Sequence, residues 1–145
     1  MKFAFPQLAL WATFFSPLRG WMHTLICFAL KEEAAPFRKL VAGKTDISVL
    51  IVGIGRENAE KSARKFLAEN SPKFVLTCGF AGGLNPDVKL GEVVFEIGNR
   101  QSAIGNQLLA AGAKPAKFFC ADRIATTIAE KKKLRAETGA DVVEM

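Results

Sequence analysis

The chain has 145 residues, of which 50% are hydrophobic and 23% are charged, a composition that indicates one globular domain and excludes disorder. Its net charge is +6, but the basic residues are scattered along the sequence. The densest basic run, 131–133, has no interleaved aromatic residue of the kind that stacks on single-stranded bases. We therefore expect no nucleic-acid partner.

The three cysteines, Cys27, Cys78 and Cys120, each lie in or beside an apolar run. This placement predicts buried, reduced thiols in a cytoplasmic protein rather than a disulfide framework. The only histidine is His23, so the sequence predicts no histidine-based zinc site. We expect neither a metal nor a cofactor.

Residues 1–21 differ from the rest of the chain: they have an early lysine, an apolar middle and no acidic residue. Pro6 interrupts the apolar run, no A-x-A-like cleavage site follows, and the run is short for a membrane-spanning helix. The favoured interpretation is an extension upstream of a true start at Met22. A secretory signal or membrane anchor, or a packed segment, are the alternatives. The remainder, 22–145, is expected to be one truncated domain with no membrane contact.

From residue 22 onward, apolar runs alternate with amphipathic ones. The expected strands are 24–29, 47–52, 73–78, 92–96, 116–120 and the start of a last one at 141–143. The expected helices are 31–41, 58–69, 101–111 and 124–137. In the second helix Ala59, Ala63, Phe66 and Leu67 share the inward face, and in the third Leu108 and Leu109 point inward.

This alternation predicts an α/β fold, a three-layer sandwich with a mostly parallel sheet. Ligands of such sheets bind outside the carboxyl ends of the strands. Two glycine turns fall there: Gly53-Ile54-Gly55 after one strand, and the run 79–83 after the next. We expect these two strands to be parallel neighbours. The first turn alone is weak evidence, because a plain strand-to-helix turn also explains it and the dinucleotide-binding fingerprint is incomplete.

The second turn is more specific. Gly79-Phe80-Ala81-Gly82-Gly83-Leu84, followed by Leu90-Gly91-Glu92-Val93-Val94, resembles the G-S-A-G-G-L turn and L-G-D-I-V strand of purine nucleoside phosphorylases and nucleosidases. The resemblance is greatest to 5'-methylthioadenosine/S-adenosylhomocysteine nucleosidases. Three further segments match in order: 29–33 resembles the A-M-x-E-E opening, 53–55 the S-G-I-G turn, and 143–145 the start of V-E-M-E.

The resemblance implies a role for each matching residue. Glu33 corresponds to the acid that activates the attacking water, and Ile54 to a residue near the 5' substituent of the sugar. Phe80, Ala81 and Gly82 correspond to the turn that lines base and ribose. Met145 corresponds to a methionine beside the ribose, with Glu144 preceding it. The implied partner is a small-molecule nucleoside of purine metabolism or methionine salvage, bound by a homo-oligomer, with a dimer favoured.

The sequence also departs from the family. Phe80 replaces the serine of the turn, and Thr77 stands where phosphorylases place a phosphate-binding arginine. Ile124 falls near the position of an aromatic ring that stacks on adenine, and the segment between Glu96 and Gln101 is shorter than the family's substrate loop. The glutamate expected next after Met145, and the later aspartate that protonates the leaving base, are not in the sequence.

We therefore expect a nucleosidase that cleaves an N-glycosidic bond by hydrolysis, in a partial and weakly active or inactive form, incomplete at the C-terminus. A phosphate-dependent phosphorylase and a non-catalytic binding or interaction fragment are the alternatives. Three site residues also have a plain structural interpretation: Glu33 as an acid at a helix N-terminus, Phe80 as a core residue, and Met145 as a disordered residue at a chain end.

Overall fold

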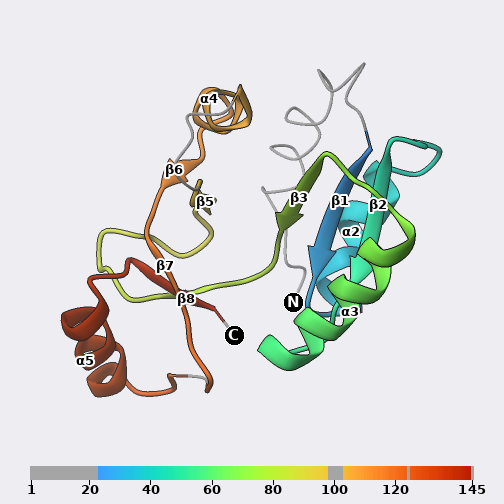
Figure 1. Cartoon of the computed structure of the whole chain (residues 1–145). Helices are drawn as coiled ribbons and strands as arrows, with labels where there is room; N and C mark the ends of the chain where they lie inside the picture. The colour runs from blue at the N-terminus through green and yellow to red at the C-terminus, as the bar shows by residue number, and fades with distance from the viewer. Residues whose placement is uncertain (1–22, 98–102, 124, 145) are drawn as a thin grey trace. The chain divides into compact units, whose positions relative to one another are not determined.

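The computed structural model of the chain describes residues 23–97, 103–123 and 125–144 (Figure 1). These residues form two compact units that divide between Phe80 and Ala81. We call the described residues up to Phe80 the N-terminal unit and those from Ala81 the C-terminal unit. The predicted extension 1–21, Ile124 and Met145 lie outside the described residues.

The N-terminal unit contains every strand and helix predicted for it. Its elements are β1 (Thr24–Phe28), α2 (Lys31–Leu40), β2 (Ile47–Ile51), α3 (Arg56–Glu69) and β3 (Phe74–Thr77). The apolar runs form the strands and the mixed segments form the helices, as their periodicity predicts.

The three strands form a parallel sheet in the order β2-β1-β3, with Thr24 in register with both Ile47 and Phe74. The chain moves from β1 to one side and then crosses back past it. Because such crossovers are right-handed, α2 and α3 lie on opposite faces of the sheet, which makes three layers (Figure 1). The expectation that β2 and β3 are neighbours is wrong, since β1 lies between them. β1 is the only one of the three whose residues are all buried, which suits the central position.

The core of the N-terminal unit lies between β1 and α2. Leu25, Ile26 and Ala34 have no exposed surface, and the rings of Phe28 and Phe37 lie 5.5 Å apart. Burying each of the larger side chains, those of Leu25, Ile26, Phe28 and Phe37, stabilises the unit by about 1.5–3 kcal/mol relative to exposure. The core therefore fixes α2 against the central strand, which in turn fixes the first turn of α2.

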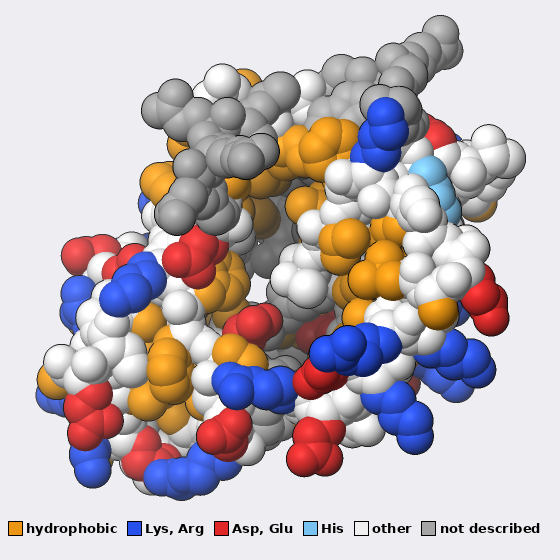
Figure 2. Space-filling view, viewed as in Figure 1, with side chains coloured by type: hydrophobic (Ala, Val, Ile, Leu, Met, Phe, Trp, Pro, Cys, Tyr) orange, Lys and Arg blue, Asp and Glu red, His pale blue; other side chains and the backbone are white. Residues whose placement is uncertain are grey.

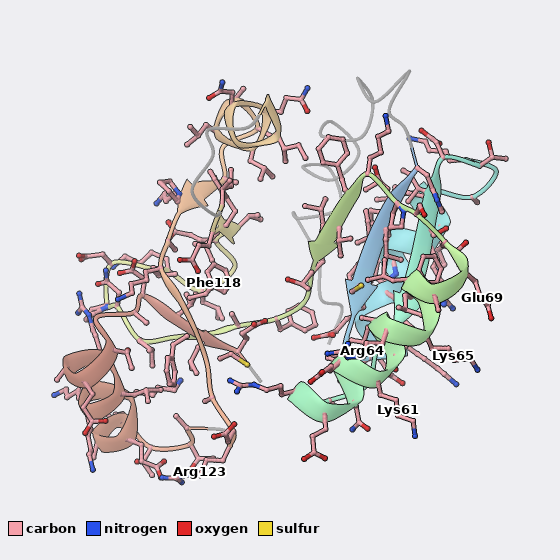
Figure 3. The ribbon with its side chains drawn as sticks, viewed as in Figure 1. Lys61, Arg64, Lys65, Glu69, Phe118 and Arg123 are labelled. Carbon is pink, nitrogen blue, oxygen red and sulfur yellow. The ribbon has the colours of Figure 1, made fainter. Side chains whose placement is uncertain are left out.

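The helix α3 presents a mixed face to the sheet. Ala59, Ala63 and Phe66 are partly buried, as predicted, whereas Leu67 is 46% exposed and the prediction for it is wrong. The inward position is taken by Ser62, whose hydroxyl donates a hydrogen bond of 3.0 Å to the carbonyl of Val52 and so sets the rotation of the helix. On the outer face, Lys61, Arg64, Lys65 and Glu69 are exposed (Figure 3).

The C-terminal unit has shorter elements. They are β4 (Gly82–Gly83), β5 (Val94–Phe95), α4 (Ala103–Ala110), β6 (Lys114–Pro115), β7 (Phe118–Cys120), α5 (Ile128–Thr138) and β8 (Val142–Glu144). The sheets have the orders β4-β8-β7 and β5-β6, and every pair except β4–β8 is parallel. β4 and β6 were not predicted, because two residues are too few to show a strand period. The core of the unit contains Leu84, Ala140 and Val143.

Two helices of the C-terminal unit differ from expectation. In α4 the buried side chain is Ile104, while Leu109 is 51% exposed, so the prediction for Leu109 is wrong. Ile104, Gln107 and Leu108 share the inward face by helical spacing. α5 begins at Ile128 rather than at 124, because Thr127 and Glu130 form a capping box that fixes its start.

The cysteines lie in three environments. Cys27 is buried, Cys78 is partly buried, and Cys120 is exposed, so the prediction that all three are buried is wrong for Cys120. Burial, and to a lesser extent the neighbouring Cys27, raises the pKa of Cys78 to about 12. The Cys78 thiol therefore stays protonated at neutral pH.

The surface carries charges of both signs. On the face shown in Figure 2, basic and acidic side chains of the described residues are interspersed rather than gathered into one basic patch. None of the helices in the described part of the chain is long and apolar enough to span a membrane.

Candidate active site

The carboxyl ends of β1 and β3 meet at the point where the chain changes direction across the sheet. Their pairing extends to Cys27 and Thr77, and the Cys78 N–H donates to the carbonyl of Cys27 at 2.8 Å. In open parallel sheets, ligands bind in the crevice outside the strand ends at such a switch point. The candidate site therefore lies where β1 leads into α2 and β3 leads into the second glycine turn.

Glu33 connects these two chain segments. It lies in the first turn of α2, where an acid is favoured by the helix dipole. Its Oε2 accepts a hydrogen bond of 3.2 Å from the N–H of Leu30, which precedes α2. Its Oε1 accepts one of 3.1 Å from the N–H of Phe80, which follows β3. The carboxylate is thus held from both sides of the switch point, as a charge-assisted acceptor.

Gly79 leaves the space in which this carboxylate lies. A Cβ built on Gly79 would be 3.1 Å from Oε1 and 3.3 Å from Oε2 of Glu33, closer than side chains normally approach. Gly79 does not have a positive φ, unlike Gly53 and Gly55. A glycine is therefore needed here for space rather than for backbone conformation.

The first glycine turn lies at the same end of the sheet, after β2. Gly53 and Gly55 have φ of +87° and +88°, a region that glycine adopts without strain. The Asn58 amide donates to the Ile54 carbonyl at 2.8 Å and holds the turn closed. The side chain of Ile54 is 45% exposed at the tip. An exposed apolar side chain at a ligand-binding edge is suited to contact an apolar substituent.

Phe80 is not a core residue. Its side chain is 67% exposed, while its backbone N–H is the donor to Glu33. The ring offers apolar surface and no side-chain hydrogen-bond donor. Of the predicted site residues in the N-terminal unit, Glu33 and Phe80 are joined by a hydrogen bond. Ile54 follows β2, which β1 separates from β3.

The other predicted residues belong to the C-terminal unit. Ala81 is exposed and precedes β4, and Gly82 pairs with Val143 of β8. A Cβ on Gly82 would lie 3.2 Å from the Val143 side chain, so glycine permits this close pairing. Glu144 follows Val143, is exposed, and is in register with Cys120.

Asp141, which the sequence analysis did not single out, ties this unit together. Its carboxylate accepts hydrogen bonds from the Lys117 N–H at 3.0 Å and the Asn85 amide at 2.8 Å, and these lower the pKa of Asp141 below its ordinary value. Its carbonyl accepts from the N–H groups of Leu84 and Asn85. Asp141 thereby fixes the loop after Gly83 against the start of β8. The Asn85-Pro86-Asp87 sequence, which is typical of a turn, was the available signal for this loop in the sequence.

A shallow depression of ≈ 400 Å³ in the C-terminal unit contains none of the predicted site residues. It is lined by Phe95, Glu96, Ile97, Pro115, Ala116, Lys117 and Asp141. Its acids serve the fold: Glu96 accepts from the Phe118 N–H at 3.0 Å, and Asp141 from that of Lys117. In the described ranges, no group of three or more His, Cys, Asp and Glu residues is arranged to hold a metal.

No family model matches the chain, but curated proteins do. One relative, from Marinomonas sp. (strain MWYL1), is 39% identical over 50 residues, which is 34% of this chain and 22% of the relative. Another, from Anoxybacillus flavithermus (strain DSM 21510 / WK1), is 30% identical over 91 residues, or 51% of this chain and 39% of the relative. Both are named 5'-methylthioadenosine/S-adenosylhomocysteine nucleosidase. These matches cover less than half the length of either relative.

Solved structures match over most of the chain. The 5'-methylthioadenosine/S-adenosylhomocysteine nucleosidase of Campylobacter jejuni aligns with a TM-score of 0.68 and 20% identity, covering 86% of this chain and 75% of that one. A futalosine hydrolase mutant of Helicobacter pylori aligns with a TM-score of 0.72 and 17% identity, with coverage of 86% and 75%. At these identities the alignments establish the fold.

The chain therefore has the nucleoside phosphorylase-like α/β fold that its motifs predict. The curated relatives are 5'-methylthioadenosine/S-adenosylhomocysteine nucleosidases, which confirms the resemblance to the nucleoside phosphorylase and nucleosidase family.

Proposed function

We propose that this chain cleaves the N-glycosidic bond of a purine nucleoside or thionucleoside by hydrolysis, with Glu33 as the general base. The observation that carries the proposal is the Glu33 carboxylate, held at the sheet switch point between the Leu30 and Phe80 N–H groups. We further propose a weakly active or inactive form; the curated matches span less than half the length of either relative.

The chemistry requires a base that stays available for a proton. A carboxylate has about four lone-pair sites, so two backbone hydrogen bonds leave sites for a bound water. In the proposed reaction, the water oxygen bonds to the anomeric carbon as the bond to the purine nitrogen breaks. Glu33 takes one proton from the attacking water, and the departing base takes a proton from solvent water. A dedicated general acid for the departing base is a contribution typically worth about 10²–10⁴-fold in rate.

Water is favoured over phosphate as the nucleophile. A phosphate dianion needs fixed positive charge or several strong donors. At this edge, the N–H groups of Leu30 and Phe80 already donate to Glu33, and Glu33 itself would repel an anion. The Phe80 side chain offers no donor, and Thr77 stands where phosphorylases place an arginine. These features support hydrolysis over the phosphorylase alternative.

The printed names of the similar proteins suggest the substrate class. They include nucleosidases of 5'-methylthioadenosine and S-adenosylhomocysteine, and a futalosine hydrolase. We propose that this chain also takes a nucleoside as its substrate, and that the exposed Ile54 and Phe80 side chains contact it. For Ala81, Gly82, Glu144 and Met145 we retain the base and ribose contacts that the resemblance implies.

One observation favours the non-catalytic alternative. Both oxygens of Glu33 are engaged by backbone N–H groups, so the residue also has a complete structural role as a clamp between α2 and the second glycine turn. A chain that used Glu33 only in this way would bind a nucleoside without cleaving it, or would not bind one.

The test is base release from 5'-methylthioadenosine, S-adenosylhomocysteine, futalosine and inosine by the 145-residue chain, with and without phosphate. We expect slow, phosphate-independent release that is lost in Glu33→Gln and kept in Glu32→Gln, the adjacent exposed acid. Phosphate-dependent release with a sugar 1-phosphate product would establish the phosphorylase alternative. Nucleoside binding by calorimetry without any release, or no binding, would establish the non-catalytic alternative.

A further inference from the structure

Gly79 has no side chain, and the Glu33 carboxylate lies close to the position that a side chain would occupy. The position of its missing Cβ is 3.1 Å from Oε1, 3.3 Å from Oε2 and 3.4 Å from Cδ of Glu33. All three atoms of the carboxyl group would therefore be in contact with a methyl group at this position. The carboxylate is seated against the backbone of Gly79.

The same carboxylate is restrained on its other sides. Oε2 is bonded to the Leu30 N–H at 3.2 Å, and Oε1 to the Phe80 N–H at 3.1 Å. A methyl group at position 79 would have to displace the carboxylate by a few tenths of an ångström. Because Phe80 directly follows Gly79, that displacement would act first on the hydrogen bond to the Phe80 N–H.

We propose that Gly79 is a positioning residue that holds the Glu33 carboxylate in the place needed for general-base catalysis. The claim about catalysis rests on the function proposed above. A general base works only within hydrogen-bond reach of the proton that it removes. A misplacement of about 1 Å costs about 100-fold in rate, so a shift of a few tenths of an ångström is enough to lower the turnover number. The substitution does not alter the chemistry of the proposed substrate-contacting side chains, so the KM should change less than the turnover number.

The substitution Gly79→Ala isolates this contact. Gly79 lacks a positive φ, so alanine does not face the strain of the left-handed region, and the three atoms nearest to its Cβ are all in the Glu33 carboxyl group. Gly83→Ala is the matched control: Gly83 also lacks a positive φ, and its Cβ would meet only the Val88 carbonyl at 3.9 Å, an ordinary contact.

The first measurement does not depend on activity. In the wild-type background, Gly79→Ala should lower the Tm by about 3 °C, whereas in a Glu33→Ala background it should leave the Tm unchanged or raise it, because replacing glycine then only restricts the unfolded chain. Hydrogen exchange at the Phe80 amide, followed by NMR, should become about tenfold faster in Gly79→Ala and not in Gly83→Ala. Equal Tm effects of Gly79→Ala in both backgrounds would overturn the inference.

The second measurement is kinetic. Gly79→Ala should lower kcat for base release about tenfold with KM changed less than about twofold. A rise in KM at constant kcat would overturn the positioning role. If the wild-type chain releases no base, the proposed function fails, whereas the Tm cycle still decides whether Gly79 seats Glu33.

Discussion

The Glu33 carboxylate accepts a hydrogen bond of 3.1 Å from the backbone N–H of Phe80, a residue 47 positions further along the chain. The bond does not depend on the Phe80 side chain, because Phe80 contributes only its backbone N–H. The acid is therefore oriented by the fold, and the exposed Phe80 ring is left available for other contacts.

Removing the Glu33 side chain should destabilise the chain as well as inactivate it. Glu33→Ala leaves the N–H groups of Leu30 and Phe80 without their acceptor, so we expect the free energy of unfolding to fall by about 1–2 kcal/mol. Glu32→Ala, at the neighbouring exposed position, should cost less than about 0.5 kcal/mol. Urea unfolding of both variants measures the difference, and equal effects would contradict the clamp.

Phe80 should affect substrate affinity more than stability. Because its ring is 67% exposed, we expect Phe80→Ala to change the Tm by less than about 2 °C and to weaken nucleoside binding about tenfold. Phe74→Ala is the control, since Phe74 lies at the opposite end of β3. It should leave nucleoside affinity unchanged, and an equal loss of affinity in both variants would contradict a specific contact at Phe80.

Alanine substitutions at the two glycines of the first turn distinguish backbone strain from steric crowding. A Cβ on Gly55 would meet no atom within 4 Å, so Gly55→Ala tests the φ of +88° alone and should cost about 1–2 kcal/mol of unfolding free energy. A Cβ on Gly53 would also lie 3.1 Å from the Asn58 Cβ, so Gly53→Ala should cost more. Chemical denaturation of the two variants gives the order, and the reverse order would contradict this geometry.

The start of α5 should weaken in acid. The Thr127 N–H, followed by the Arg123 guanidinium and the Thr126 N–H, lowers the pKa of Glu130 to about 2, against about 4.3 in an unfolded chain. Since the folded pKa is the lower one, the stabilisation is present above about pH 4.3 and is lost as the pH falls through about 2.

We therefore expect Glu130→Gln to lower the Tm at pH 6, with the gap to the wild-type chain closing towards pH 2. Glu137→Gln, in the same helix, is the control, because Glu137 forms only a long ion pair of 3.8 Å with Lys133 among the contacts described for the helix. A gap that stays constant across this pH range would show that the Glu130 carboxylate is not the stabilising group.

The alternation of elements was predictable because its signals are local. Apolar runs define β1, β2 and β3, with a glycine shortly after β2 and β3, and the charged segments between the strands define the helices. The resemblance, carried by short motifs, also indicated the fold, while the catalytic role of Glu33 stays a prediction.

What could not be predicted depends on contacts between distant residues. β1 is central because it is the strand that is buried on both faces of the sheet. Ser62 faces inward in place of Leu67 because its hydroxyl donates a hydrogen bond to the Val52 carbonyl. The engagement of both Glu33 oxygens depends on β3 docking beside β1. The hydrophobic periodicity of the sequence does not reveal these contacts between distant residues.

The strand order also has a consequence for folding. Thr24 pairs with Ile47 in β2 and with Phe74 in β3, so the second pairing closes a chain segment more than twice as long as the first. Loop closure makes the longer-range pairing the slower one to form. Because Glu33 reaches the Phe80 N–H only once β3 has paired, the clamp is expected to form late in folding, and the carboxylate acquires its orientation only when this sheet is complete.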